Sequence, residues 1–195
     1  MNLRNSCKRI TEFLALAAFL IPFLCSSTRG AASSSALAVT NCKCGITNWI
    51  VYSPADHGFS VRFPSQPRIL ITTNNHTAVG SMVNTQYVVS PAHYIAFSVG
   101  CNSFPSNLNL SDKEQFYEQT LKDLLAKNLK LLSSTTNSVR GHEGREWKFE
   151  MIKEQNVIIM RHYLVGHRLY QVHCLMRKDR YCPKHASEFL DSFEL

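Results

Sequence analysis

The residues with the clearest chemical potential are a cysteine and a histidine near the C-terminus, in the run Cys182-Pro183-Lys184-His185. Proline suits the first helical position, so the run predicts a helix N-terminus. A cysteine at this place lies at the positive end of the helix dipole, and a nearby His or Lys lowers its thiol pKa further. Cys182 and His185 are therefore candidate catalytic residues. The alternative is that Cys182 forms a disulfide or only caps the helix.

A second candidate is the pair His162 and His173, in two apolar runs joined by Gly166-His167. A two-residue connection of this kind predicts a β-hairpin. The register that follows pairs Tyr163 with Tyr170, His162 with Gln171, and Ile159 with Cys174. It places His162 and His173 diagonally on one face, close enough to share a metal ion if a third ligand converged. The alternative is two solvated polar residues on a half-exposed sheet.

The cysteines indicate disulfide bonds more than a metal site. Of the seven in the chain, five follow the first 32 residues: Cys42, Cys44, Cys101, Cys174 and Cys182. In an oxidising compartment all five are disulfide candidates. Because five is odd, at least one thiol stays free or pairs outside the chain. Cys42 and Cys44 are too close to bridge each other, so they are alternative partners for a distant thiol, and the connectivity stays open.

Residues 1–32 have the order of a secretory signal. Basic residues precede an apolar run from Phe13 to Cys25, which is shorter than the roughly 20 residues that a membrane span needs. Small residues follow, and we expect cleavage after Ala32 or after Ala38. Lipidation of Cys25 is the minor alternative. The sequence thus predicts an exported bacterial protein, periplasmic or secreted, whose only membrane contact is through the signal before cleavage.

Charge and motifs exclude several function classes. Removal of residues 1–32 lowers the net charge from +7 to +4, and the remaining Lys and Arg are scattered. No run of them tracks a phosphate backbone, so nucleic-acid binding is not expected. The chain has no Gly-x-Ser-x-Gly elbow and no Gly-rich phosphate loop, and no cofactor is expected.

The order of elements predicts an α+β fold. We expect a linker over residues 33–46 and a single domain over residues 47–195. Ser111 and Glu114 form a capping box, which predicts a helix over residues 111–128. A second helix is expected over residues 183–195. The expected strands lie at 49–52, 59–63, 69–73, 78–89, 93–99, 129–135, 145–152, 157–165 and 168–176. Neighbouring strands joined by short turns indicate an antiparallel sheet of about six or seven strands packed with these helices.

The two faces of the hairpin over residues 157–176 differ in polarity. The more apolar face carries Tyr163, Val165, Tyr170, Val172, Cys174 and Met176. The other face carries His162, Gln171 and His173. Because side chains alternate across a strand, we expect the first face to be the core side.

Four segments together resemble small exported bacterial proteins of the PsbP and DcrB fold group. They are Gly58–Pro64, Gly144–Phe149, Arg161–Gln171 and Phe189–Phe193. The resemblance covers about residues 49–195 and implies an α/β/α sandwich with a sheet of about seven antiparallel strands between helices. Members of that group act as photosystem accessory subunits, envelope proteins or partner-binding factors. The shared segments are turn and core signatures, so no catalytic residue is carried over.

The sequence supports two hypotheses of function. The first is a non-enzymatic envelope or secreted module that binds a partner protein or a small ligand through one sheet face or its loops. The second is a thiol- or metal-dependent enzyme that uses Cys182 and His185, or the face of His162 and His173. The second requires these groups to converge in space.

Overall fold

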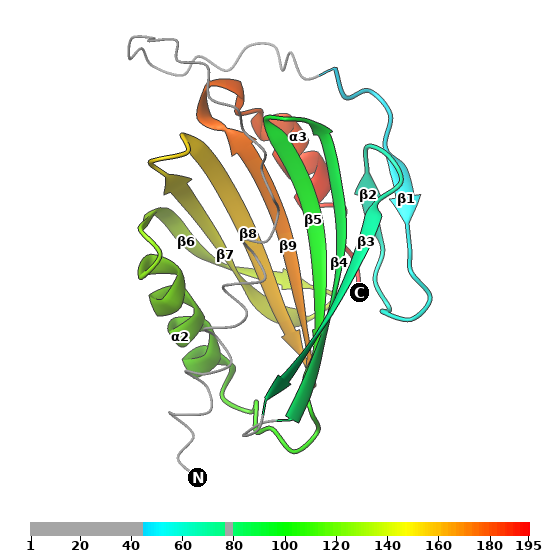
Figure 1. Cartoon of the computed structure of the whole chain (residues 1–195), viewed down its shortest axis with the longest axis vertical. Coiled ribbons are helices and arrows are strands. Elements are labelled where there is room, and N and C mark those ends of the chain that lie inside the picture. The colour runs from blue at the N-terminus through cyan, green and yellow to red at the C-terminus, as the bar shows by residue number, and fades with distance from the viewer. Residues whose placement is uncertain (1–44, 77–79) are drawn as a thin grey trace.

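The computed structural model describes residues 45–76 and 80–195 of the chain (Figure 1). Its elements, in chain order, are β1 Ile50–Tyr52, β2 Val61–Phe63, β3 Arg68–His76, β4 Gly80–Ala92, β5 Ile95–Ser103, α2 Lys113–Leu125, β6 Leu129–Val139, β7 His142–Met151, β8 Asn156–Val165, β9 Arg168–Arg177, the short 3-10 helix η1 Lys178–Arg180, and α3 Pro183–Leu190. The expected signal, its cleavage sites, the linker up to residue 44, Cys25, Cys42 and Cys44 lie outside the described residues.

Seven strands form one antiparallel sheet in the order β3-β4-β5-β9-β8-β7-β6, while β1 and β2 form a separate pair. Helices α2 and α3 cover opposite faces of the large sheet (Figure 1). The arrangement is an α/β/α sandwich, which confirms the expected α+β fold. Strands β3 and β6 are its two edges. In the described residues no helix has the length and apolar composition that crossing a membrane requires.

The β8–β9 hairpin has the expected register. Tyr163 pairs with Tyr170, His162 with Gln171, and Ile159 with Cys174. The connection turns at Gly166, whose φ of 56° lies in the left-handed region that glycine adopts without steric cost. The turn therefore fixes which side chains of the two strands share a face.

The face of the sheet toward α3 is an aromatic and aliphatic core. The residues expected there, Tyr163, Tyr170, Val172, Cys174 and Met176, are all buried in it. Phe189 of α3 packs on Phe97 of β5, with ring centroids 4.9 Å apart, and the β1–β2 pair adds Phe63 against Phe189. We call this side the α3 face.

The opposite side, the α2 face, is also a core. Phe116 and Leu124 of α2 cover Trp147 and Phe149 of β7, and all four are almost fully buried. The expectation that this side is a half-exposed polar face is wrong for the central strands. Strand β5 is buried at eight of its nine positions, as a central strand covered on both sides must be.

The helix starts differ in detail from the expected capping box. Asp112, not Ser111, is the N-cap of α2, and its carboxylate accepts the N–H of Gln115 at 2.9 Å. Glu114 does not close a capping box but forms an ion pair with Arg145. The helix begins one residue later than expected because two adjacent residues, Ser111 and Asp112, both suit the N-cap position.

The boundaries of β4 and α3 also differ from the expected ones. Strand β4 continues through Ser90-Pro91, where a strand break was expected, because the sheet absorbs the proline in a register shift between Val89 and Ala92. Helix α3 ends at Leu190 instead of continuing to residue 195. The last residues return to an extended form, and Glu194 pairs with Ser60 in an isolated bridge.

Candidate functional site

His162 on β8 and His173 on β9 lie on the α2 face and contact each other directly. Their Nε2 atoms are 2.9 Å apart, which is a hydrogen-bond distance. One ring must therefore carry its proton on Nε2 and donate it to the bare Nε2 of the other. The sequence placed the two residues diagonally on one face, and the structure brings them into contact there.

Both imidazoles are buried, with 1% and 6% of their surface exposed for His162 and His173. Burial lowers the pKa of His173 to about 4. Burial also lowers the pKa of His162 well below its ordinary value, and the neighbouring His173 adds to this effect. Desolvation penalises the charged form, so both rings are neutral at neutral pH.

The histidine pair belongs to a wider polar strip in the middle of the α2 face. We use this name for six buried residues on β4, β5, β9 and β8: Asn84, Ser98, Asn102, Gln171, His173 and His162. Asn102 donates to the Gln171 side-chain oxygen at 2.8 Å, and the Gln171 amide nitrogen lies 3.4 Å from His162 Nε2. The strip is thus linked by hydrogen bonds from β5 to β8.

Among the described residues, the strip does not supply the third ligand that a metal site at the histidine pair requires. Within residues 45–76 and 80–195, no group of three His, Cys, Asp or Glu side chains converges on one point. His162 Nδ1 is buried without a hydrogen-bond partner among those residues, and the Trp147 and His162 rings pack in a T-shaped pair with centroids 5.1 Å apart. Two neutral imidazoles in contact can share a proton, but alone they supply too few ligands for a typical closed zinc site.

Cys182 and His185 lie at the start of α3, as expected. Cys182 is the N-cap, and its sulfur accepts the His185 backbone N–H at 3.5 Å. Cys182 is buried and disulfide-bonded, so it has no thiol that titrates. The His185 ring is buried against Trp49, with Nδ1 3.5 Å from the Glu188 carboxylate. While the disulfide is intact, this sulfur offers no thiolate nucleophile.

The two candidate sets do not converge. Cys182 and His185 pack on the α3 face, whereas His162 and His173 lie on the α2 face, with the sheet between them. Cys101 and Cys174 are both buried on the α3 face. Burial raises the pKa of the Cys101 thiol to about 11, so at neutral pH it is an unreactive thiol.

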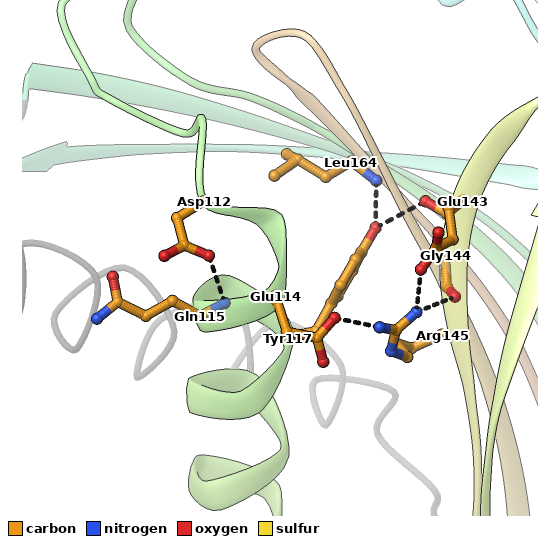
Figure 2. A network of polar contacts seen from close by, with 8 residues as sticks. All are labelled: Asp112, Glu114, Gln115, Tyr117, Glu143, Gly144, Arg145 and Leu164. Atoms are coloured by element: carbon orange, nitrogen blue, oxygen red, sulfur yellow. Dashed lines mark hydrogen bonds and ion pairs between the residues drawn. The ribbon is translucent and has the colours of Figure 1, made fainter.

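A network that the sequence did not indicate fastens α2 to the sheet (Figure 2). The Tyr117 hydroxyl accepts the Leu164 N–H at 2.8 Å and donates to the Glu143 carbonyl at 3.3 Å. It therefore lies between backbone groups of β8 and β7 just beyond their last ladder pair, Gly144 with Tyr163. Burial raises the Tyr117 pKa to about 12, so the hydroxyl keeps its proton.

Arg145 completes this network. Its guanidinium lies over the Tyr117 ring, 5.4 Å from the centroid, and donates to the Glu143 carboxylate at 2.7 Å and to the Gly144 carbonyl at 3.1 Å. It also pairs with Glu114 of α2. The pairing partners are exposed, so these ion pairs orient the arginine more than they stabilise the fold. The network is a structural connection with its polar groups mutually satisfied.

The edge strand β3 carries three consecutive exposed apolar residues. Ile69, Leu70 and Ile71 expose 52%, 38% and 69% of their surface. Ile69 and Ile71 are register partners of Tyr87 and Thr85, and Leu70 is the partner of Gln86 on the opposite face. The sequence predicted a strand at residues 69–73, but strand order depends on distant pairing, so its edge position could not be read from it.

A seven-stranded antiparallel sheet between helices, with the β8–β9 hairpin at its centre, defines an α/β/α sandwich. No protein-family model and no curated protein matches the sequence. The solution structure of cyanobacterial PsbP (CyanoP) from Synechocystis sp. PCC 6803 is similar, with 13% identity over 82% of this chain and 98% of that chain and a TM-score of 0.52. The crystal structure of PA94, a protein of unknown function from Pseudomonas aeruginosa, has 9% identity over 72% of this chain and 90% of that one, with a TM-score of 0.39.

The chain thus has a PsbP-like fold, as the sequence segments suggested. The statement rests on the cyanobacterial structure, and at this identity the likeness establishes the fold alone.

Proposed function

We propose that the protein is a non-enzymatic accessory module of the cell envelope or secreted fraction, and that it binds a partner protein along strand β3. The observation that carries the proposal is the exposure of Ile69, Leu70 and Ile71 on the outermost strand of the sheet. An incoming extended segment adds one more strand to such an edge. Backbone hydrogen bonds then supply affinity, and alternate side chains supply specificity.

The backbone of β3 supports strand addition. Among the described residues, no backbone hydrogen bond joins β3 to any segment other than β4. Half of the N–H and C=O groups of an edge strand point outward, away from its only neighbour. Natural edges are blunted by lysine, proline or a bulge, and β3 has none of these between Ile69 and Thr73.

The other edge shows what a protected edge looks like. Strand β6 has a register shift between Leu131 and Ser133, and its exposed middle is the polar run Ser133–Ser138. Such a bulge twists an edge away from incoming strands. The sheet is therefore protected at β6 and left open at β3, which favours β3 as the binding edge.

Export remains part of the proposal. The basic and apolar start of the chain has the order of a secretory signal. The disulfide at Cys182 supports it, because such bonds persist in oxidising compartments and are rare in the cytosol. Cys42 and Cys44, outside the described residues, stay the expected partners of Cys182. Peptide mapping without reduction would identify the partner and the cleavage site together.

The test compares the two edges. Ile71→Lys places a charge on β3, and Leu132→Lys places the same charge at the bulge of β6, where Leu132 exposes 44% of its surface. Tagged protein is recovered from the exporting cell after photo-cross-linking from position 70. We expect a cross-linked partner that Ile71→Lys abolishes and Leu132→Lys retains. Equal recovery with both variants, or no cross-link from position 70, would overturn the proposal.

A further inference from the structure

We infer that the occupant of the β3 edge is a second copy of this chain, paired antiparallel about a two-fold axis at Leu70. The inference rests on the proposed function, since it names the partner of the same edge. Homodimers with two-fold symmetry are the commonest protein assemblies, and their interface must be self-complementary. Strand β3 meets that requirement in charge, in side-chain pattern and in register.

The charge pattern permits like-with-like pairing. From Ile69 to Asn75 the strand has no charged residue, so two copies bring no like charges into direct opposition. Like charges placed opposite each other would destabilise the pairing. Arg68 is the only Lys or Arg of β3, and it is at the start of the strand.

The side chains select a register. Residues paired across a two-fold axis must lie on the same face of the joined sheet, so an even-numbered residue faces an even-numbered one. A centre at Leu70 sets Leu70 against its own copy on the α2 face and Ile69 against Ile71 of the second copy, twice, on the α3 face. Each of these three side chains, exposed in the single chain, then gains an apolar cross-strand neighbour.

The same register keeps the arginines apart. Arg68 faces Thr72 of the second copy, so the two Arg68 positions are offset by four residues along the strands. At about 3.3 Å per residue this is roughly 13 Å. That distance exceeds the screening length of about 8 Å at physiological salt. The charge of Arg68 therefore does not oppose the pairing.

Pairing of β3 with β6 of another copy would be different. Such a head-to-tail contact does not close, and it builds chains of molecules. The bulge and polar run of β6 disfavour it. The asymmetry of the two edges thus limits assembly to a closed dimer.

The experiment uses two cysteine variants of the full chain. In the proposed register Leu70→Cys faces its own copy at about 4.5–5.5 Å between Cα atoms, within disulfide range. Thr72→Cys lies on the same face and is also exposed, but it is roughly 13 Å from its copy. We expect a 70–70 link, located by peptide mapping after mild oxidation, and no 72–72 link. Buried Cys101 and Cys174 are the internal background.

Oligomeric state is measured alongside, by sedimentation equilibrium over a range of protein concentration. Ile71→Lys is expected to raise the dimer dissociation constant by roughly tenfold to a hundredfold, because a charge then faces an apolar neighbour. Leu132→Lys is expected to leave the constant unchanged. Circular dichroism of both variants confirms that the fold is kept.

The outcomes separate this inference from the proposed function. A monomer at all concentrations, or equal links at positions 70 and 72, overturns the dimer. If position 70 then cross-links to a different protein and Ile71→Lys abolishes that link, the binding edge stands with another occupant. If position 70 links to nothing, both statements fail.

Discussion

The two faces of the sheet are buried by different means. On the α3 face aromatic rings pack edge to face or tilted around Phe97 and Phe189. On the α2 face the apolar side chains of α2 cover one part, and the middle holds the polar strip from Asn84 to His162. The α3 face is stabilised by close packing of apolar side chains. The middle of the α2 face is stabilised by hydrogen bonds between buried polar groups.

This difference predicts which kind of change destabilises each face. A buried polar group without a partner costs about 1–3 kcal/mol, whereas a paired one is close to neutral. The α2 face avoids most of this cost because His162, His173, Gln171 and Asn102 contact one another. Protonation or the loss of a single hydrogen bond should therefore destabilise the α2 face. The α3 face should instead be destabilised by cavities.

The largest expected effect is a cavity on the α3 face. Phe189→Ala removes a fully buried ring in contact with Phe97 and Phe63. We expect a loss of about 3–5 kcal/mol in the free energy of unfolding, measured with urea. Ser187→Ala, on the exposed side of the same helix, should change it by less than about 0.5 kcal/mol. A loss below about 1 kcal/mol for Phe189→Ala would contradict the cavity argument.

The next effect is a dependence of stability on pH that belongs to the α2 face. The pKa of both His162 and His173 is lowered in the folded protein, to about 4 for His173, against an ordinary value of 6.5. The unfolded chain therefore binds more protons between these values. The stabilisation is complete above about pH 7 and is lost as the pH falls from 6.5 toward 4. For His173 the loss is roughly 3 kcal/mol.

Unfolding measured with urea from pH 7.5 to 4 checks this prediction. The double variant His162→Leu and His173→Leu replaces both partners with apolar groups, so it should remove most of the slope. It leaves the buried Gln171 amide nitrogen without its His162 contact, so we expect a cost of about 1–3 kcal/mol at pH 7. His167→Gln changes an exposed histidine of the same hairpin and should keep the slope. Phe189→Ala should keep it too, which separates the two faces. A double variant with an unchanged slope would contradict the assignment.

Local signals predicted the parts of the fold that local forces decide. The β8–β9 register followed from a two-residue turn at Gly166 between two apolar runs. The stripe of α3 followed from helical spacing, and Ala186, Phe189 and Leu190 are buried as expected. The fold group could also be recognised, because its recurring segments are turn and core signatures of this kind.

The features that the sequence did not predict depend on pairing between segments that are distant in the chain. The polar side of β9 is buried because β5, some 70 residues earlier, pairs with it and α2 covers part of that face. Alternation alone predicts His173 as solvent-facing, and the contact with His162 supplies a hydrogen-bond partner for its buried ring. The Tyr117 connection and the edge position of β3 depend in the same way on strand order, which alternation does not specify.

The smallest predicted effect tests whether hydrogen bonds hold the α2 face. Tyr117→Phe keeps the ring and removes the hydroxyl that lies between the Leu164 N–H and the Glu143 carbonyl. Two backbone groups then lose their partner, and we expect a loss of about 1–3 kcal/mol in the free energy of unfolding.

The matched control is Tyr181→Phe, which removes a half-buried hydroxyl that accepts from Lys148 Nζ at 3.1 Å. It should cost less than about 1 kcal/mol, because water can replace that bond. In the Tyr117 variant, the amide of Leu164 should also exchange its hydrogen faster, since its acceptor is gone. An equal loss of unfolding free energy in the two variants, with unchanged hydrogen exchange at Leu164, would contradict this prediction. It would mean that the Leu164 N–H and the Glu143 carbonyl are satisfied without the Tyr117 hydroxyl. Packing of the ring would then be what holds α2 to the sheet, and the contrast between the two faces would reduce to the histidine pair.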